Sequence, residues 1–141
     1  KERKAILEEL KNETRTIILY EAPHHLVGTL QELYQALGNR RMTLCRELTK
    51  KHETAFRTTI EDLIAFYKDQ KPLGECVLVI EGRSRKEMEQ ESQESWRDIS
   101  IEEHMAIYEN QGIARKEAMK MVAKDRGVTK RDIYQALLLQ K

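Results

Sequence analysis

The segment from Tyr20 to His25 carries a phenol, a carboxylate and two imidazoles directly after a short apolar run, Thr16 to Leu19. The apolar run is typical of a buried strand, and Pro23 ends it because proline has a fixed φ and no backbone donor. Open α/β sheets bind their ligands in the turns that leave the carboxyl ends of strands. The pattern therefore predicts a turn that presents these polar groups to a ligand.

Polar residues also follow two later runs that are typical of strands, Arg41 to Arg46 and Glu75 to Glu81. They are Arg46, Glu47, Thr49, Lys50, His52 and Glu53 after the first of these runs, and Glu81 and Arg83 after the second. If the strands are neighbours in one sheet, we expect these groups to gather along one edge. Loops are polar in every protein, so a functional edge and an ordinary solvated edge both remain open.

The residue types limit the chemistry. Four of them could in principle bind a metal ion: His24, His25, His52 and Glu53. Adjacent histidines at the start of a helix diverge by about 100° and rarely reach one ion, so we predict no metal site. The two cysteines lie inside apolar runs, which favours reduced core thiols over a disulfide, and the sequence shows no nucleophile elbow and no Gly-rich phosphate loop.

Periodicity predicts the elements that position these groups. Helices are expected at residues 1–12, 24–37 and 59–68, strands at 15–20, 41–46, 55–59 and 75–81, and a loop at 47–53. Gly38 is a favourable stop for the second helix, and Thr59 with Asp62 brackets a capped start for the third. Helices that alternate with strands predict an α/β or α+β lobe that ends near Arg83.

The rest of the chain differs in composition. Residues 84–99 are rich in Glu, Gln and Ser, which predicts an acidic linker or mobile loop. Three helical patterns follow at 100–110, 114–126 and 129–140, where Thr129 with Asp132 predicts a capped start for the last. Three short helices predict a small helical domain like a helix-turn-helix. The expected domains are therefore 1–83, the linker 84–99, and 100–141.

The formal net charge of +1 hides an asymmetry between these parts. Residues 84–110 carry three Lys/Arg against eight Asp/Glu, whereas residues 111–141 carry eight against three. A basic tail beside an acidic connector favours contact of the tail with a polyanion. The whole sequence is 35% charged and 40% apolar and has no run long enough to span a membrane, so we expect a cytoplasmic protein with no membrane partner.

Three motifs resemble those of a known family. They are Leu19-Tyr20-Glu21-Ala22-Pro23-His24, then Cys45-Arg46-Glu47-Leu48-Thr49-Lys50 with Glu53, then Gly74-Glu75-Cys76-Val77-Leu78-Val79-Ile80-Glu81-Gly82. In order and spacing they resemble the C-terminal part of the ribosomal RNA small-subunit cytidine 2'-O-methyltransferases, in the tetrapyrrole (corrin/porphyrin) methylase superfamily. The resemblance covers residues 1–83 strongly and the helical tail more loosely. It implies the C-terminal lobe of a methylase-like α/β fold, with a mixed sheet flanked by helices.

The resemblance also implies an activity. Enzymes of this family bind S-adenosylmethionine between two lobes and methylate a ribose 2'-hydroxyl of small-subunit ribosomal RNA, commonly as homodimers. The family's N-terminal lobe has no counterpart here, so the chain is expected to be a fragment that is inactive alone. By position, the expected cofactor-binding residues are Tyr20, Glu21, Ala22, Pro23, Val79, Ile80, Glu81 and Gly82. The resemblance assigns no catalytic base to this half of the cleft.

The residues expected to contact RNA are basic or lie in the first motif's turn. They are His24, His25, Arg46, Lys50, Arg57, Arg115, Lys116, Lys130 and Arg131. The chain departs from the family at His25, where an arginine is usual. This departure replaces a guanidinium group, which is always charged, with an imidazole.

Several alternatives remain open. Arg46 and Glu47 could instead form an ion pair that stabilises the lobe, and the basic tail could be the solvated face of a small helical core. For the whole chain the main alternative is a non-enzymatic nucleic-acid-binding module, and a weaker one is a methylase that acts on a tetrapyrrole.

Overall fold

The computed structural model describes residues 1–139, which divide into two compact units, Lys1–Ser84 and the chain from Arg85 onward. The first unit contains α1 (Glu2–Leu10), β1 (Ile17–Glu21), a short 3-10 turn η1 (Pro23–His25), α2 (Leu26–Leu37), β2 (Arg41–Arg46), β3 (Thr54–Thr59), α3 (Ile60–Phe66) and β4 (Cys76–Ile80). The second unit contains α4 (Arg85–Glu94), α5 (Ile101–Glu109), α6 (Arg115–Arg126) and α7 (Lys130–Leu139).

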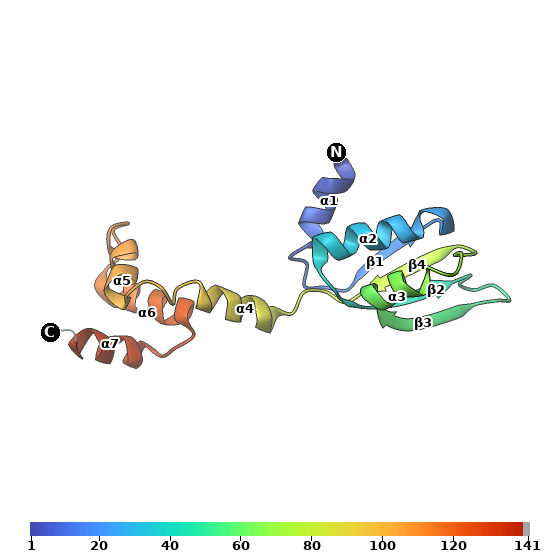
Figure 1. Ribbon diagram of the computed structural model, residues 1–141. Coiled ribbons are helices and arrows are strands. Elements are labelled where there is room, and N and C mark those ends of the chain that lie inside the picture. The colour runs from blue at the N-terminus through green and yellow to red at the C-terminus, as the bar shows by residue number, and fades with distance from the viewer. Residues whose placement is uncertain (140–141) are drawn as a thin grey trace. The chain divides into compact units, whose positions relative to one another are not determined.

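The four strands form one sheet in the order β1-β4-β2-β3 (Figure 1). The α/β composition of the unit is confirmed, but all three strand pairings are antiparallel, whereas a mixed sheet is implied by the family resemblance. The strands β1 and β2 run in the same direction across the α2 crossover. Because β4 lies between them in the opposite direction, they never pair with each other.

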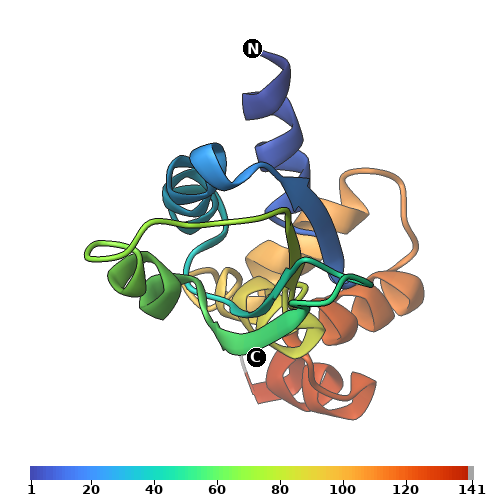
Figure 2. The same ribbon diagram turned by 90° about the vertical axis from the view of Figure 1, so that its right-hand side faces the viewer.

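One face of the sheet is covered by α2 and α3, which lie on the same side of the strands (Figure 2). Leucines recur in α2 at the spacing that keeps one face of a helix apolar, and Leu26, Leu30 and Leu33 are fully buried. They pack with Leu44 and Leu78 of the sheet. Burying one such side chain stabilises a fold by about 1.5–3 kcal/mol, so this face supplies most of the unit's core.

The ends of these helices follow the caps expected from the sequence. Gly38 ends α2 with a φ of 76°, a left-handed value that glycine adopts without strain. At the start of α3 the backbone N–H of Asp62 donates to the hydroxyl of Thr59 over 3.1 Å. These caps confirm the sequence-based prediction of where α2 ends and where α3 begins.

Residues 85–94 form the helix α4, so the expectation of a mobile loop was wrong for this part of the segment 84–99. The helix buries none of its own residues. Its sequence therefore lacks the apolar spacing that indicates a helix, and its polar composition suggested a loop. Glu, Gln, Lys and Met are nevertheless strong helix formers, and their summed propensity favours a helix without a buried face.

The helices α5, α6 and α7 pack around a small core that contains Met105, Ala118, Val122, Ile133 and Leu137. Each helix has a defined end: Ser100 and Glu103 form a reciprocal capping box at α5, and Gly127 ends α6 with a φ of 68°. At α7 the hydroxyl of Thr129 accepts from the N–H of Asp132 over 3.1 Å, which confirms the expected cap.

The helical unit also contains a buried polar network that sequence reasoning missed. The side chain of His104 is 0% exposed and stacks on Trp96, with ring centroids 3.9 Å apart. Its Nδ1 accepts from the Nε of Arg126, and its Nε2 lies 2.9 Å from a carboxylate oxygen of Asp125. Nδ1 therefore acts as the acceptor in this network, and Arg126 also donates to the carbonyl of Ile99 over 2.7 Å.

The same network raises the pKa of Tyr108 to about 12, because its hydroxyl donates to the carboxylate of Asp125 and is partly buried. A raised folded-state pKa means that the stability from this hydroxyl is full below the ordinary value of about 10 and is lost as the pH rises through 12. We expect the difference in 295-nm absorbance titrations between the chain and Tyr108→Phe to have its midpoint near 12. A midpoint near 10 would contradict the hydrogen bond.

Candidate ligand-binding face of the sheet

The face of the sheet that α2 and α3 do not cover is open within the first unit. Because side chains alternate along a strand, even-numbered residues of β1 and odd-numbered residues of β2, β3 and β4 share this face. The strand register aligns them in two rows: Ile18, Val79, Thr43 and Arg57, and Tyr20, Val77, Cys45 and Ala55. Tyr20 is 83% exposed, so this open face presents an unshielded aromatic ring.

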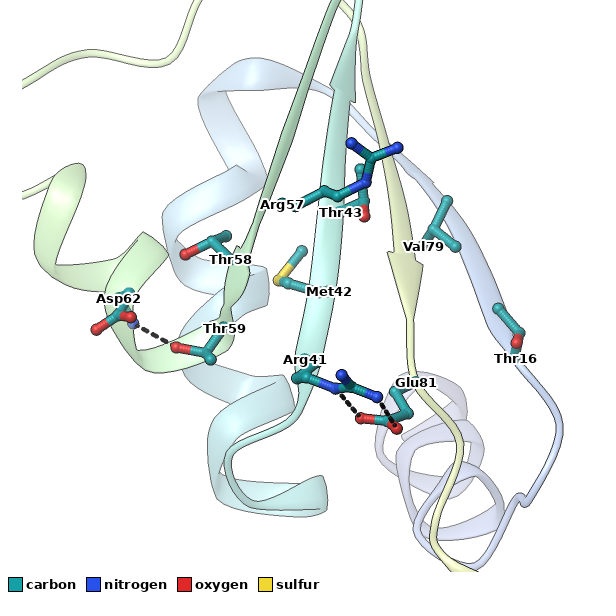
Figure 3. Close-up of a pocket in the computed structure, with 10 residues that line it drawn as sticks. All are labelled: Thr16, Arg41, Met42, Thr43, Arg57, Thr58, Thr59, Asp62, Val79 and Glu81. Atoms are coloured by element: carbon teal, nitrogen blue, oxygen red, sulfur yellow. Dashed lines mark hydrogen bonds and ion pairs between the residues drawn. The ribbon is translucent and has the colours of Figure 1, made fainter.

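Two hollows lie on the open face. The first, of about 620 Å³, is lined by Thr16, Arg41, Met42, Thr43, Arg57, Thr58, Thr59, Asp62, Val79 and Glu81 (Figure 3). The second, of about 680 Å³, is lined by Tyr20, Glu21, Ala22, Leu48, Thr49, Glu75, Cys76 and Val77. Both fall within the size range of sites for small molecules and cofactors.

The first hollow contains a fixed ion pair and a cation without a recorded partner. Arg41 donates twice to the carboxylate of Glu81, over 2.9 and 3.1 Å, and this pair lowers the pKa of Glu81 and raises that of Arg41. Within residues 1–139, the exposed side chain of Arg57, which stands over Thr43 in Figure 3, makes no hydrogen bond or ion pair. The hollow therefore offers one guanidinium to an anionic ligand.

We expected the polar groups that follow the strands to gather along one edge of the sheet, and they do not all do so. The end of β1 and the end of β2 both meet the start of β4, since Glu21 and Arg46 each align with Cys76. Glu81 follows the other end of β4, five residues and about 17 Å along the strand from Cys76. The physical reason is the antiparallel insertion of β4, which reverses the direction in which its polar end points.

Glu21 is held inside the unit by several partners. Its carboxylate accepts from the hydroxyl of Thr29 over 2.5 Å and from the N–H of Ala22 over 3.0 Å, and Arg3 lies 3.7 Å away. Partial burial acts to raise the pKa of Glu21, but these hydrogen bonds and the nearby guanidinium outweigh it, so the pKa is lowered. Glu21 therefore links β1 to α2 and α1 as an ionised group.

The loop after β2 has an unusual backbone. Glu47 and Thr49 have φ values of 51° and 65°, a left-handed conformation that costs a non-glycine residue about 1–2 kcal/mol. The Glu47 carboxylate accepts from the N–H of Glu75 over 2.8 Å and also pairs with Lys50, which lowers its pKa. These contacts hold the strained loop against the turn before β4.

Two of the basic residues expected to contact RNA are already engaged at this loop. Arg46 donates to the carbonyl of Leu73 over 2.8 Å, and Lys50 bridges Glu47 and Glu75 at 3.2 Å from each. Arg46 and Glu47 therefore have separate partners, and the alternative in which they form an ion pair with each other is not what the structure shows. His24 and His25 lie in η1 with their rings 4.1 Å apart and exposed to solvent.

The residues of the helical unit that were expected to contact RNA differ in exposure and pairing: Lys130 is half-buried, and Arg115, Lys116 and Arg131 are exposed. Arg115 pairs with Glu109 over 3.1 Å. Within residues 1–139, the side chains of Lys116, Lys130 and Arg131 make no hydrogen bond or ion pair, although Arg131 interacts electrostatically with Asp132. These three cations are thus available to a phosphate backbone.

Metal and disulfide chemistry find no support in the described part of the chain. Within residues 1–139, no three His, Cys, Asp or Glu side chains converge as a metal site requires. Cys45 and Cys76 are both free thiols, and they point to opposite faces of the sheet because Cys45 aligns with Val77. No helix in the same residues combines the length and apolar character needed to cross a bilayer.

Sequence reasoning missed Arg41, Thr43 and Thr16, which line the first hollow. Strand parity carries the signal for Arg41 and Thr43, since both lie at odd positions of β2 and share a face with Val79. That signal becomes useful only when the partner strands and their register are known.

Comparison with known proteins finds relatives that are named as enzymes acting on ribosomal RNA. It is 43% identical over 136 residues to a protein of Bacillus subtilis, 42% identical over 134 residues to one of Halalkalibacterium halodurans, and 39% identical over 137 residues to one of Synechocystis. All three are named ribosomal RNA small subunit methyltransferase I. The chain matches no protein-family model.

These matches cover 95–96% of the chain but only 46–47% of each relative. The chain therefore spans about half the length of the curated relatives it matches, which agrees with the resemblance to a C-terminal part. Over the part that it spans, the chain belongs to the ribosomal RNA small subunit methyltransferase I family.

Proposed function

We propose that the chain is the C-terminal part of an S-adenosylmethionine-dependent methyltransferase that modifies a cytidine ribose 2'-hydroxyl in small-subunit ribosomal RNA. The observation that carries the proposal is the identity of 39–43% over nearly the whole chain to proteins named for this activity on ribosomal RNA. The open face of the sheet supports it, because a lobe that shares a cofactor cleft needs an uncovered face with hollows of ligand size.

The residues present fit half of such a cleft. Tyr20 offers an exposed ring and Val77 an apolar side chain to the adenine of the cofactor, while Glu81 and Arg41 supply polar groups at the other hollow. Tyr20 to Pro23 and Val79 to Gly82 lie at opposite ends of the β1–β4 pair. We infer that one cofactor molecule contacts both of these segments only if it lies parallel to the strands on the open face.

S-adenosylmethionine, when bound, supplies the methyl group as an electrophilic sulfonium. The chain's own contribution is to hold and orient the cofactor and to exclude water, since methyl transfer depends on alignment of the reacting atoms. Arg57 is suited to a phosphate of the RNA next to the cleft because it is exposed and has no recorded partner. We expect the base that removes the hydroxyl proton to lie outside the chain.

The helical unit is proposed to hold the RNA. Lys116, Lys130 and Arg131 are exposed or half-buried cations without recorded partners among the described residues, and such groups bind phosphates with an affinity that falls as salt rises. We further propose a cytoplasmic homodimer, as the family resemblance implies, with the chain inactive without the missing half.

The test is a chimera in which the chain replaces the matching half of the Bacillus subtilis relative. We expect labelled S-adenosylmethionine to transfer its methyl group to a cytidine ribose of small subunits that lack the modification, and the chain alone to transfer none. In the chimera, Tyr20→Leu should lower transfer about tenfold through the lost aromatic contact. The matched control is Tyr34→Leu, an exposed tyrosine on α2 outside the open face.

A folded chimera that transfers no methyl group to any subunit would overturn the proposal. Equal losses in Tyr20→Leu and Tyr34→Leu would remove Tyr20 from the cofactor site while leaving the activity itself in place.

A further inference from the structure

One flank of α7 combines positive charge with an exposed aromatic ring. Ile133 and Leu137 turn into the helical core. Residues three and four apart on a helix are neighbours, so the side chains of α7 outside the core can be grouped by their spacing. Lys130, Arg131, Tyr134 and Leu138 form one continuous flank, and Tyr134 at its centre is 54% exposed.

The acidic residue of the same helix interacts electrostatically with the adjacent Arg131 but lies away from the tyrosine. Asp132 lies on the other side of α7, about 160° from Tyr134 around the helix axis. Its carboxylate accepts from the N–H and the hydroxyl of Thr129, over 2.9 and 2.7 Å, and so serves the helix cap. The flank is therefore cationic around an aromatic ring, and this is the combination that binds RNA by phosphate contact and base stacking.

We propose that Tyr134 is a stacking platform for an unpaired base of the RNA, with Lys130 and Arg131 on the adjoining phosphates. The inference rests on the proposed contact of the helical unit with RNA and narrows its substrate to single-stranded nucleotides. The narrow, deep major groove of A-form RNA does not admit side chains from a helix, so α7 has no base edges to read in a duplex. An unpaired base presents its flat face to an aromatic ring directly.

The residue types of the flank favour an unpaired RNA base as the ligand over another protein. A protein-binding helix face usually has an apolar centre with charges at its rim, whereas here Leu138 is the only large aliphatic side chain among the four residues of the flank. Two adjacent cations next to one tyrosine are the residue types that bind phosphates around a stacked base, and they offer little surface to an apolar partner.

The experiment measures binding of the complete 141-residue chain to two fluorescein-labelled probes, an unstructured 15-nucleotide pyrimidine RNA and a 15-base-pair RNA duplex. We expect Tyr134→Leu to weaken binding to the single strand about 5- to 50-fold, and Tyr134→Phe to bind within about twofold of the unaltered chain. The slope of log affinity against log salt concentration should be unchanged in Tyr134→Leu. In Arg131→Gln the magnitude of this slope should fall by about 0.7, which is the contribution of one phosphate contact to single-strand binding.

Tyr34→Leu is the matched control, since it removes an exposed tyrosine from the first unit. Single-strand affinity that is unchanged in Tyr134→Leu, or lost to the same degree in Tyr34→Leu, would overturn the stacking role. An equal loss on the duplex would do the same, because stacking needs an unpaired base. If the unaltered chain binds neither probe, RNA contact by the helical unit fails as well, whereas methyl transfer by the chimera is measured separately.

Discussion

Replacing His104 with asparagine is expected to lower the free energy of unfolding of the helical unit by about 3 kcal/mol. The imidazole is fully buried and bonds to Arg126 and Asp125 at once, so its loss removes one hydrogen-bond partner from each charged group. Among the described residues, Arg126 then keeps only the carbonyl of Ile99, and Asp125 keeps only the hydroxyl of Tyr108. An unsatisfied buried group costs about 1–3 kcal/mol, and more when it is charged. The shorter asparagine also leaves space beneath Trp96.

Urea unfolding followed by tryptophan fluorescence measures this effect directly. Trp96 is the only tryptophan of the chain and stacks on His104, so its emission reports the helical unit. His52→Asn is the control, because His52 is an exposed loop residue of the first unit and its replacement should change the free energy of unfolding by less than about 0.5 kcal/mol. Equal midpoints for the two variants would show that the network contributes nothing to the fold.

The His104 network marks the limit of what the sequence could predict for the helical unit. The helices and their caps follow from local patterns such as Ser100 with Glu103, because capping involves residues only three positions apart. The partners of His104 lie 21 and 22 residues away in the sequence, and no local pattern connects them. A lone histidine in a polar helix therefore gave no signal of a buried group.

The same distinction applies to the sheet. The strand β4 was recognisable from its run of Cys76 to Ile80 between two glycines, and its alternating burial confirms it. Its position between β1 and β2 was not recognisable, because strand order depends on tertiary packing rather than on a local pattern. This is why Tyr20 and Glu81 were expected at one edge of the sheet and lie toward opposite ends of the open face.

Replacing Gly82 with alanine is expected to destabilise the first unit by about 2–3 kcal/mol. The backbone here passes very close to another segment: the N–H of Arg83 donates to the carbonyl of Glu13 over 2.7 Å. A Cβ at position 82 would overlap the carbonyl of Thr14 and lie 2.5 Å from the carbonyl oxygen of Arg15. Neither backbone group can rotate away, so the added methyl must push the segment off the end of β4, and overpacking of this kind costs about 1–3 kcal/mol.

Gly28→Ala is the matched control with the opposite sign. A Cβ at Gly28 would meet nothing within 4 Å, and alanine is favoured over glycine in a helix interior by about 0.5–1 kcal/mol, so this variant should be more stable than the unaltered chain. Urea midpoints of both variants test the pair. The result also bears on the cofactor site, since Gly82 is one of its proposed residues. A Gly82→Ala chain as stable as the original would remove the steric reason for glycine and leave contact with the cofactor as its explanation, whereas the expected loss shows that this glycine is required by the fold before any ligand binds.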